Sequence, residues 1–597
     1  MSASIRTYSS TASRCAARLT PRPTARLSAW LTRWRAVRLV AALAVVVGAV
    51  AVAPLFAQQN AGAPMVSPPI KADPPPLPPI TYQDLLSGLS NPSRWLTYSG
   101  DYTGRRHSPL RQITPGNVDR LVAQWTFQAE GMAIGRGFES TPLMMDGVLY
   151  ISGTNNMAWA IDARTGRQIW RYRRAFPPGL TYGGANPANR GLALLGDKVY
   201  MATLDAHVIA LDRNTGRVVW DSVMDDYKLG HAGIAAPLIV KDKVIVGNSG
   251  GDIPTRGFVD AFDAQTGKRA WRFYTIPAAG EKGSETWSHA EVLPRGGGAT
   301  WATGSYDPEL NLVYWGTGNP NPDYFGEDRK GNNLYTASLL ALDADTGVLK
   351  WHYQFTPHDL HDWDSNHVPV LADLTIAGRP RKVVMVANRN GFFYTLDRIT
   401  GEMLVGKPYT ATKWAREIGP KGPIVLNDGV IPEGGSEATT PCVPDLRGGT
   451  VYNPPSYDPA LQQFYVMARE TCAYYTPQRQ EFRIGTVFMS GGMRKLADPD
   501  YSALRALDPR TGEMKWEFKF PTATLAGVMS TASGLVFAGD NEGNFNAFDG
   551  KSGKQLWTYR TGSMVWGGTG MTYMLDGKQY VLIPSGNTVM AFGLLER

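Results

Sequence analysis

One short segment, TPHDLHDWDSNH at residues 356–367, concentrates side chains that can bind a metal ion or take up a proton. They are His358, Asp359, His361, Asp362, Asp364 and His367, beside Trp363. This density predicts a metal site or a general base, with a solvated polar turn as the structural alternative. A His-x-x-His zinc site is a further interpretation. No other Cys/His cluster with zinc spacing occurs, however, and the acid oxygens favour a hard cation.

Two Gly-rich segments offer further oxygen ligands. GNSGGDIPTRGF contains Asp252, and WGTGNPNPDYFG contains Asn319 in a Gly-Asn-Pro turn. Each side chain could equally cap its own turn, because Asp and Asn often accept hydrogen bonds from backbone amides in turns. Each signal is therefore weak when it is taken alone.

A repeat predicts the elements that position these segments. From residue 140 onward, an apolar-Asp-x-x-Thr-Gly unit recurs with a Trp four residues after the Gly. The Trp residues are Trp170, Trp220, Trp271, Trp351, Trp516 and Trp557, and TLDRITGEMLV is a copy without Trp. Each copy is typical of two strands joined by a tight turn, in which Asp caps the amides and Gly supplies positive φ. We therefore expect an all-β fold, an eight-bladed β-propeller with docking Trp residues, closed by the segment around Trp125.

The excess of positive charge in the chain is confined to its beginning. The formal net charge is +8, and residues 1–57 contain eight Arg but no Lys, Asp or Glu, so the remainder is formally neutral. Nucleic acid therefore has no support as a partner. The apolar run that follows Arg38 predicts an export signal cleaved after Ala57, or an uncleaved membrane anchor, and hence a periplasmic location.

The rest of the chain divides into a linker and a folded domain. Residues 58–80 are rich in Pro and predict an extended linker, and residues 81–597 form the predicted propeller. Cys15 lies in the export segment, which leaves Cys442 and Cys472 in an oxidising compartment. We expect these two to form a disulfide, with two buried thiols as the alternative.

Over residues 81–597, the sequence resembles the quinoprotein alcohol dehydrogenases. These are eight-bladed propellers that bind pyrroloquinoline quinone (PQQ) and a metal ion. The strings that carry the resemblance are RWLTYSGDYTGRRHSPL, GTGNP, ANRNGFFYTLD and AFDGKSGKQLWTYRTG. The resemblance implies that the chain oxidises an alcohol to an aldehyde or ketone by hydride transfer to the quinone.

Matching positions imply individual roles. The implied metal ligands are Asp252, in place of the family's Glu, Asn319 and Asp362, which also matches the catalytic base. Arg389 matches the Arg beside the quinone oxygens. Arg190 matches a carboxylate-binding Arg, Glu139 a cofactor contact, and Trp301 the indole under the quinone. Asp364 resembles the additional carboxylate of the lanthanide-dependent members, so the ion is calcium or a lanthanide.

Departures from the family pattern keep alternatives open. GGANPANRG places Gly184 and Ala185 where many members have adjacent cysteines, so a sugar or polyol dehydrogenase remains an alternative. A non-enzymatic exported propeller scaffold is a second alternative, although it would not need this set of polar residues. No Cys-x-x-Cys-His occurs, and the resemblance implies a separate cytochrome c or quinone as the electron acceptor.

Overall fold

The computed structural model of the chain describes residues 77–133, 135–180, 187–419, 422–427, 429, 436–439 and 444–596. These all belong to one of the two units into which the chain divides, residues 64–597. The predicted export segment, most of the linker, Gly184, Ala185 and Cys442 lie outside the described residues. Among the described residues, no helix has the length and hydropathy needed to cross a membrane.

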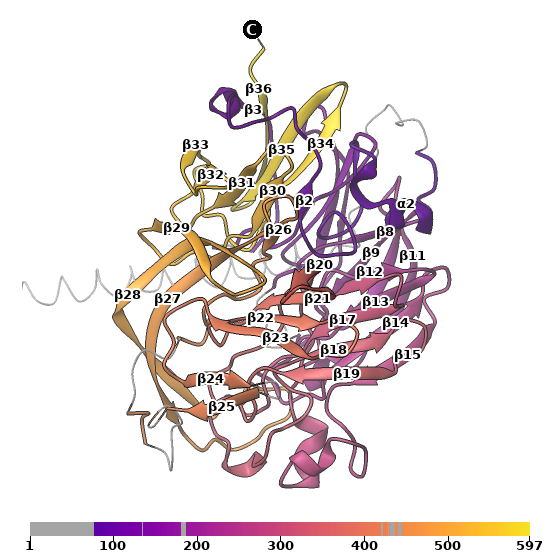
Figure 1. Cartoon of the computed structure of the whole chain (residues 1–597). Helices are drawn as coiled ribbons and strands as arrows, with labels where there is room; N and C mark the ends of the chain where they lie inside the picture. The colour runs from indigo at the N-terminus through magenta and orange to yellow at the C-terminus, as the bar shows by residue number, and fades with distance from the viewer. Residues whose placement is uncertain are drawn as a thin grey trace, which may run out of the picture. The chain divides into compact units, whose positions relative to one another are not determined.

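Eight sheets of four or five strands, with one two-stranded ribbon, make up the β-structure of the described residues (Figure 1). The first four sheets are β1 (Arg94–Trp95) with β4 (Leu143–Met145), β5 (Val148–Gly153), β6 (Met157–Asp162) and β7 (Gln168–Arg173); β8 (Ala193–Leu195), β9 (Lys198–Thr203), β10 (His207–Asp212) and β11 (Val218–Val223); β12 (Leu238–Val240), β13 (Lys243–Gly247), β14 (Phe258–Asp263) and β15 (Arg269–Tyr274); and β16 (Ser305–Asp307), β17 (Leu312–Gly316), β18 (Ser338–Asp343) and β19 (Leu349–Gln354).

The remaining sheets continue in chain order. They are β20 (Val370–Ile376), β21 (Arg379–Ala387), β22 (Phe392–Asp397) and β23 (Met403–Pro408); β26 (Ser456–Asp458), β27 (Gln463–Pro477), β28 (Gly491–Leu507) and β29 (Met514–Phe520); β2 (His107–Ser108) with β30 (Val528–Thr531), β31 (Leu535–Gly539), β32 (Asn544–Asp549) and β33 (Gln555–Arg560); β34 (Met571–Leu575), β35 (Lys578–Ser585), β36 (Thr588–Leu594) and β3 (Leu121–Gln128); and the ribbon β24 (Ala415–Gly419) and β25 (Gly422–Leu426).

Helices are short in the part of the chain that the structure describes. They are α2 (Tyr82–Ser87) and the 3₁₀ turns η1 (Gly88–Ser90), η2 (Val118–Arg120), η4 (Tyr227–Leu229), η5 (Ser284–Thr286), η6 (Ala290–Arg295) and η7 (Glu327–Arg329). The prediction of an all-β propeller is confirmed, and the eight sheets correspond in number to the eight expected blades.

The last sheet joins the two ends of the folded chain. β3 pairs antiparallel with β36, and Trp125 lies opposite Ala591. The N-terminal strand thereby becomes the outer strand of the sheet formed by the C-terminal residues, as predicted for the segment around Trp125. The fold also extends into the predicted linker, because Ile80 is buried and pairs with Gly196.

The repeated turn has the expected local structure. Asp162 Oδ1 accepts hydrogen bonds from the backbone amides of Arg164, at 2.9 Å, and Thr165, at 3.0 Å. Gly166 follows with φ of 73°, and a Cβ at this position would lie only 2.6 Å from the indole of Trp125. The turn therefore requires Gly for two reasons, its backbone conformation and the close approach of a Trp from the neighbouring sheet.

The Trp residues dock each sheet against the next. In six sheets the indole Nε1–H donates to the backbone carbonyl that follows the Asp of the neighbouring repeat. The pairs are Trp125 with Ala163 (3.0 Å), Trp170 with Arg213 (2.8 Å), Trp220 with Ala264 (3.1 Å), Trp271 with Ala344 (3.2 Å), Trp351 with Arg398 (3.2 Å) and Trp516 with Gly550 (3.0 Å). The structural interpretation is therefore confirmed for five of the six predicted Trp residues and extends to Trp125, since each of these indoles satisfies its N–H at the neighbouring sheet. The sixth, Trp557, contacts Phe592 of the next sheet edge to face, with ring centroids 5.4 Å apart.

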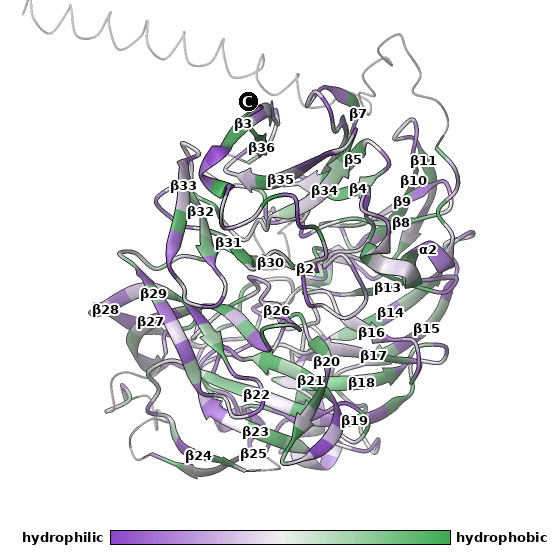
Figure 2. Cartoon of the chain, turned by 45° about the horizontal axis from the view of Figure 1, so that its top comes forward, coloured by the Kyte–Doolittle hydropathy of each residue, from purple (hydrophilic) through white to green (hydrophobic). Residues whose placement is uncertain are grey.

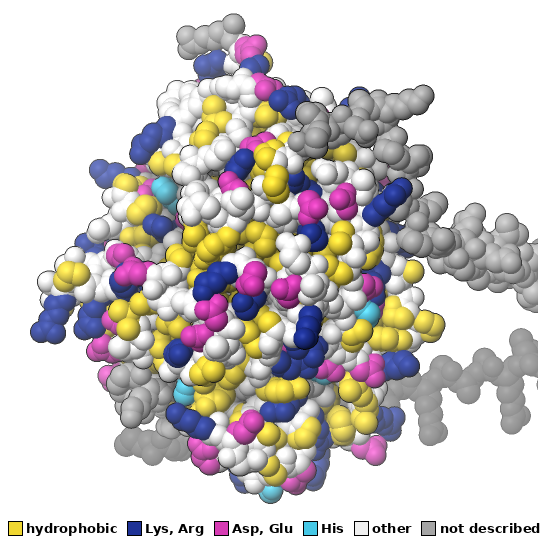
Figure 3. Space-filling view, turned by 90° about the vertical axis from the view of Figure 1, so that its right-hand side faces the viewer, with side chains coloured by type: hydrophobic (Ala, Val, Ile, Leu, Met, Phe, Trp, Pro, Cys, Tyr) yellow, Lys and Arg dark blue, Asp and Glu magenta, His cyan; other side chains and the backbone are white. Residues whose placement is uncertain are grey.

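The last strand of a repeat is much more exposed than the strands inside its sheet. β9 is entirely buried, whereas β11 alternates between exposed and half-buried residues. Inner strands such as β18 and β21 are accordingly mainly hydrophobic (Figure 2). On the face shown in Figure 3, Lys and Arg side chains are interspersed with Asp and Glu, in keeping with the neutral charge that follows the N-terminal segment.

Candidate active site

The predicted catalytic, cofactor-binding and metal-binding residues all lie in connections at one end of the sheets. The four consecutive strands of each repeat are antiparallel, so the connection between the second and third strands and the connection to the next sheet leave by the same edge. The Asp-x-x-Thr-Gly turns join the third and fourth strands at the opposite edge. The connections that hold the site are β13–β14 (Asp252), β17–β18 (Asn319), β19–β20 (Asp362 and Asp364), β21–β22 (Arg389), β3–β4 (Glu139), β7–β8 (Arg190) and β15–β16 (Trp301).

An acidic cluster forms where three of these connections meet. Asp252, Asp323 and Asp362 each contribute a carboxylate oxygen, and these oxygens lie within 4.8 Å of one another. Asn319 joins them, because its Nδ2 donates to Asp323 Oδ1 at 2.8 Å and its backbone N–H donates to Asp364 Oδ1 at 2.9 Å. Among the described residues this is the one group of three acidic, His or Cys side chains close enough to share an ion. Its oxygen donors suit a hard cation.

Arg389 lies against two of the carboxylates. Its Nη1 is 3.2 Å from Asp362 Oδ1 and 3.3 Å from Asp364 Oδ2, and it also donates to the backbone carbonyl of Asp362. Asp362 has φ of 60°, which is unusual for a residue other than Gly. Such strained conformations persist where the surrounding structure enforces them, often at functional sites. The fold thus holds Asp362 in a fixed position beside a permanent positive charge.

Burial makes the carboxylates hard to ionise together. It raises the pKa of Asp252 to about 6 and the pKa values of Asp323 and Asp362 well above their ordinary range. Repulsion from neighbouring carboxylates acts in the same direction, and Arg389 opposes it at Asp252 and Asp362. Burial alone lowers the pKa of Arg389, but the nearby carboxylates raise it overall. A bound cation would relieve this repulsion.

A second group of side chains forms an aromatic and basic wall. Arg190 Nη2 is 2.9 Å from Glu139 Oε2, and its guanidinium lies 4.6 Å from the ring centroid of Trp301 and 4.4 Å from that of Tyr452. Trp301 Nε1–H donates to Asp364 Oδ2 at 3.1 Å, which ties this wall to the acidic cluster. All of these residues line one cavity of about 260 Å³, together with Asp252, Asp362 and Arg389.

Several buried polar atoms of the site have no hydrogen-bond partner among the described residues. They include Nε and Nη1 of Arg190, Oδ1 of Asn319 and Oδ2 of Asp323. Unpaired buried polar groups are costly, so such a concentration indicates a missing ligand. The free donors suit an anionic ligand and the free oxygens suit a cation, so the site fits an acidic quinone held with a metal ion.

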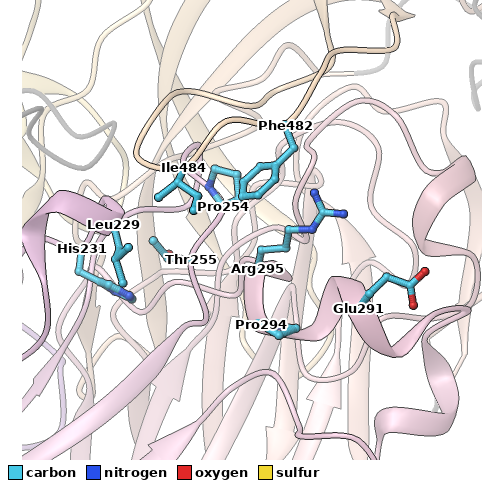
Figure 4. A pocket seen from close by; sticks show the side chains of 9 residues that line it. All are labelled: Leu229, His231, Pro254, Thr255, Glu291, Pro294, Arg295, Phe482 and Ile484. Atoms are coloured by element: carbon cyan, nitrogen blue, oxygen red, sulfur yellow. The ribbon is translucent and has the colours of Figure 1, made fainter.

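A larger pocket of about 470 Å³ lies beside the site (Figure 4). Pro254 and Thr255 reach it from the Asp252 connection, and Phe482 and Ile484 reach it from the β27–β28 connection. None of the clustered carboxylates lines it. The smaller cavity is therefore the better candidate for chemistry.

The histidines of residues 356–367 have structural contacts. His358 Nδ1 lies 2.9 Å from the Gly331 carbonyl, and His361 stacks on Trp363 with ring centroids 4.1 Å apart. Burial lowers the pKa of His367 to about 3, and its Nε2 accepts a hydrogen bond from the Arg389 backbone N–H. The zinc interpretation therefore gains no support from the described residues, because none of these histidines joins the acidic cluster.

Two residues of the site were missed by the sequence reasoning. Asp323 lies four residues after Asn319 in the same Pro-rich segment, and Tyr452 precedes β26. Asp323 could have been considered as a candidate because it is an acidic residue close in sequence to the predicted ligand Asn319. The sequence does not reveal, however, which way the side chain of a turn residue points. Cys472 is buried in β27, and its predicted partner Cys442 lies outside the described residues, so the disulfide stays a prediction.

Comparisons with known proteins agree with this geometry. The family described as "Glucose/ethanol/alcohol dehydrogenase, beta-propeller domain", a PQQ family, matches residues 95–410 and 486–581. Quinoprotein alcohol dehydrogenase PedH of Pseudomonas putida is 35% identical over 530 residues, covering 85% of this chain and 88% of that protein. A quinoprotein ethanol dehydrogenase of Pseudomonas aeruginosa is 33% identical, covering 85% and 88%.

Solved structures show the same likeness. A europium-containing methanol dehydrogenase superposes with a TM-score of 0.80 at 30% identity, covering 86% of this chain and 100% of that one. The quinohemoprotein alcohol dehydrogenase ADHIIG of Pseudomonas putida gives 0.79 at 32% identity, covering 87% and 83%. Together with the cavity of carboxylates, arginines and indole, these matches show that the chain belongs to the PQQ-dependent quinoprotein alcohol dehydrogenases.

Proposed function

We propose that this protein oxidises an alcohol to an aldehyde or ketone, using PQQ and a metal ion that is calcium or a lanthanide. The observation that carries the proposal is the single cavity in which Asp362, Arg389, Arg190 and Trp301 meet beside an acidic cluster. A propeller that acted only as a scaffold would have no need to bury four carboxylates together with unpaired arginine donors.

The described side chains divide into two binding groups. Arg190 and Arg389 offer charged donors to the anionic oxygens of the quinone, and Trp301 offers an aromatic surface. Asp252, Asn319, Asp362 and Asp364 offer oxygen ligands to the ion. When bound, the quinone supplies a two-electron acceptor and the ion supplies Lewis-acid polarisation.

Asp362 is the proposed base. Its carboxylate lines the cavity, is buried from bulk water and is held by Arg389 Nη1 at 3.2 Å. Arg389 stabilises the ionised form of Asp362, so that the carboxylate can accept the proton of the alcohol hydroxyl as the hydride leaves the carbon. A positioned base of this kind typically contributes about 10²- to 10⁴-fold to the rate.

The proposal also includes a cellular location and an electron acceptor. The basic and apolar N-terminal segment supports export to the periplasm, with the segment either cleaved or retained as an anchor. We propose that electrons pass to a separate cytochrome c or quinone, the acceptors that the family resemblance implies.

Reconstitution tests the function directly. The purified chain is mixed with PQQ and either calcium or lanthanum, and a redox dye reports oxidation of a panel of alcohols, polyols and sugars. Reduction of the dye with alcohols is expected. If no combination reduces the dye, the proposed function is wrong, and if only sugars or polyols do so, the substrate class is wrong.

A variant tests the base. Asp362→Ala should abolish turnover while the quinone still binds, as measured by quenching of Trp fluorescence. Asp328→Asn, a change in a half-exposed acid of the β17–β18 connection, serves as the control and should retain full activity. Turnover by Asp362→Ala near the rate of the parent would exclude Asp362 as the base.

A further inference from the structure

Asp323 is the member of the acidic cluster with no assigned role. It lies in the β17–β18 connection, four residues after Asn319, and it is 0% exposed. One of its carboxylate oxygens lies within 4.8 Å of the ligand oxygens of Asp252 and Asp362. A fully buried carboxylate among other carboxylates is costly unless a positive charge compensates for it.

The two oxygens of Asp323 have different surroundings. Oδ1 accepts hydrogen bonds from Asn319 Nδ2 at 2.8 Å and from Asn321 Nδ2 at 3.4 Å. Oδ2 is buried and has no hydrogen-bond partner among the described residues. One oxygen is therefore committed to orienting side-chain amides, while the other is left for a ligand.

The hydrogen bond to Asn319 has a consequence for that residue. Because Nδ2 is occupied by Asp323, Oδ1 is the atom of the Asn319 amide that remains available, and it too has no partner among the described residues. This oxygen faces the Asp252 connection, since a Cβ on Gly251 would lie 3.1 Å from it. Asp323 thus turns the Asn319 oxygen toward the other acidic ligands.

The backbone on both sides of the cluster is fixed by one connection. Between β27 and β28, the Phe488 N–H donates to the Asp252 carbonyl at 2.9 Å, and the Met489 carbonyl accepts from the Tyr324 N–H at 3.0 Å. Tyr324 directly follows Asp323 in the chain. The same segment therefore fixes the backbone at Asp252 and next to Asp323, the two residues whose carboxylate oxygens lie within 4.8 Å of each other.

We propose that Asp323 is a further ligand of the metal ion and that it also orients Asn319 as a ligand, an inference that rests on the proposed function. Four carboxylates, those of Asp252, Asp323, Asp362 and Asp364, then meet two buried guanidinium groups. Arg389 lies against Asp362 and Asp364, and Arg329 lies beside Asp323, where its Nη2 donates to the Asp323 backbone carbonyl at 3.4 Å. Attraction between an ion and a carboxylate scales with the ion's charge, so a trivalent ion gains about one and a half times as much from Asp323 as a divalent ion. The fourth carboxylate therefore favours a lanthanide over calcium.

The test is ion binding by the purified chain, measured by terbium luminescence sensitised by Trp and by competition with lanthanum and calcium. Asp323→Asn preserves the shape and an oxygen for Asn319 but removes the charge. We expect it to weaken terbium binding by at least roughly 10- to 100-fold. That range is typical of losing a residue that only hydrogen-bonds to a metal ligand, and a direct ligand should matter at least as much. Calcium binding should weaken by a smaller factor. The control Asp328→Asn makes the same change in the same connection and should bind terbium like the parent.

Thermal unfolding separates a ligand from a merely structural residue. Without an ion, Asp323→Asn relieves repulsion between carboxylates, so the melting temperature of the variant should equal or exceed that of the parent. Added lanthanum should raise the melting temperature of the variant by less than it raises that of the parent. A lower ion-free melting temperature with an undiminished rise on adding lanthanum would mean a structural role and overturn the proposal. Should Asp323→Asn not fold, Asp323→Glu retains the charge but displaces the oxygen by one methylene. It should bind terbium more weakly, and unchanged affinity would overturn the proposal.

The failure of this proposal can be told apart from the failure of the proposed function. If the parent chain binds terbium and Asp323→Asn binds it equally well, only the assignment of Asp323 is wrong. If the parent binds none of the three ions, with or without PQQ, the metal site itself is wrong, and both proposals are overturned.

Discussion

Removing Arg190 should affect folding and cofactor binding separately. Arg190 and Glu139 form a pair in which the two side chains are only 11% and 6% exposed. Arg190→Gln leaves Glu139 as a buried carboxylate without its partner. Breaking one side of a buried ion pair typically costs about 3–5 kcal/mol of folding free energy. The double variant Arg190→Gln/Glu139→Gln removes both charges and should recover most of that loss.

The loss of PQQ affinity caused by removing Arg190 should remain in the double variant, even though its folding stability recovers. Arg190 Nε and Nη1 are buried and unpartnered within the described residues, and they are the donors that we assign to the quinone's anionic oxygens. Each hydrogen bond to a charged group is worth about 1.5–3 kcal/mol. Loss of both should weaken PQQ binding by about 3 kcal/mol or more, which is roughly 100-fold or more.

Two measurements separate the effects. Urea unfolding of the ion-free and quinone-free protein gives the folding free energies of the parent, the single variants and the double variant. Quenching of Trp fluorescence by added PQQ gives the affinities. If the double variant folds like the parent and binds PQQ equally tightly, then Arg190 does not contact the cofactor and the assignment of the aromatic and basic wall is wrong.

Three further predictions concern other parts of the fold. Trp170→Phe removes the donor to the buried Arg213 carbonyl and should cost about 1–3 kcal/mol in urea unfolding, and an unchanged midpoint would contradict the docking role. Gly318→Ala places a Cβ only 2.4 Å from Asp364 Oδ1, so it should weaken lanthanum binding in the terbium competition, and parental affinity would show that Asp364 is not held there. Burial lowers the pKa of His358 from 6.5 to about 4, so between these pH values the unfolded chain binds a proton that the folded chain does not. His358 alone should therefore lower the stability by up to about 1.4 kcal/mol for each pH unit as the pH falls from 6.5 to about 4, on top of the effects of other groups. His358→Asn should lose less stability than the parent over this range in urea unfolding, and an equal loss would contradict the assignment.

Much of the fold could be predicted because its determinants are local. The Asp162 cap, the positive φ of Gly166 and the position of Trp170 all lie within nine residues of one repeat, and each has a physical reason that the sequence displays. Seven copies of the turn, with one further blade closed by the segment around Trp125, gave the expectation of eight blades. The structure confirmed this closure through the pairing of β3 with β36.

The site was predicted by resemblance, and the structure added what the resemblance left out. Separate connections deliver Asp252, Asn319, Asp362 and Arg389, and the fold places them around one cavity with Arg190 and Trp301. Asp323 and Tyr452 were not predicted as site residues, because neither lies in a sequence pattern that distinguishes a site residue from a turn residue. Their proximity to the cluster and to Arg190 is visible only in three dimensions.

The repeating strand-turn-strand unit, the docking role of the Trp residues and the excess of positive charge in residues 1–57 could all be derived from residues close together in the chain. The tertiary structure alone decided which carboxylates share one space and which oxygen of Asp323 remains unpaired. The physical reason is that the charges and desolvation that define the site act between side chains of separate connections, such as Asp252, Asp323 and Asp362, and only the folded chain brings these side chains within reach of one another.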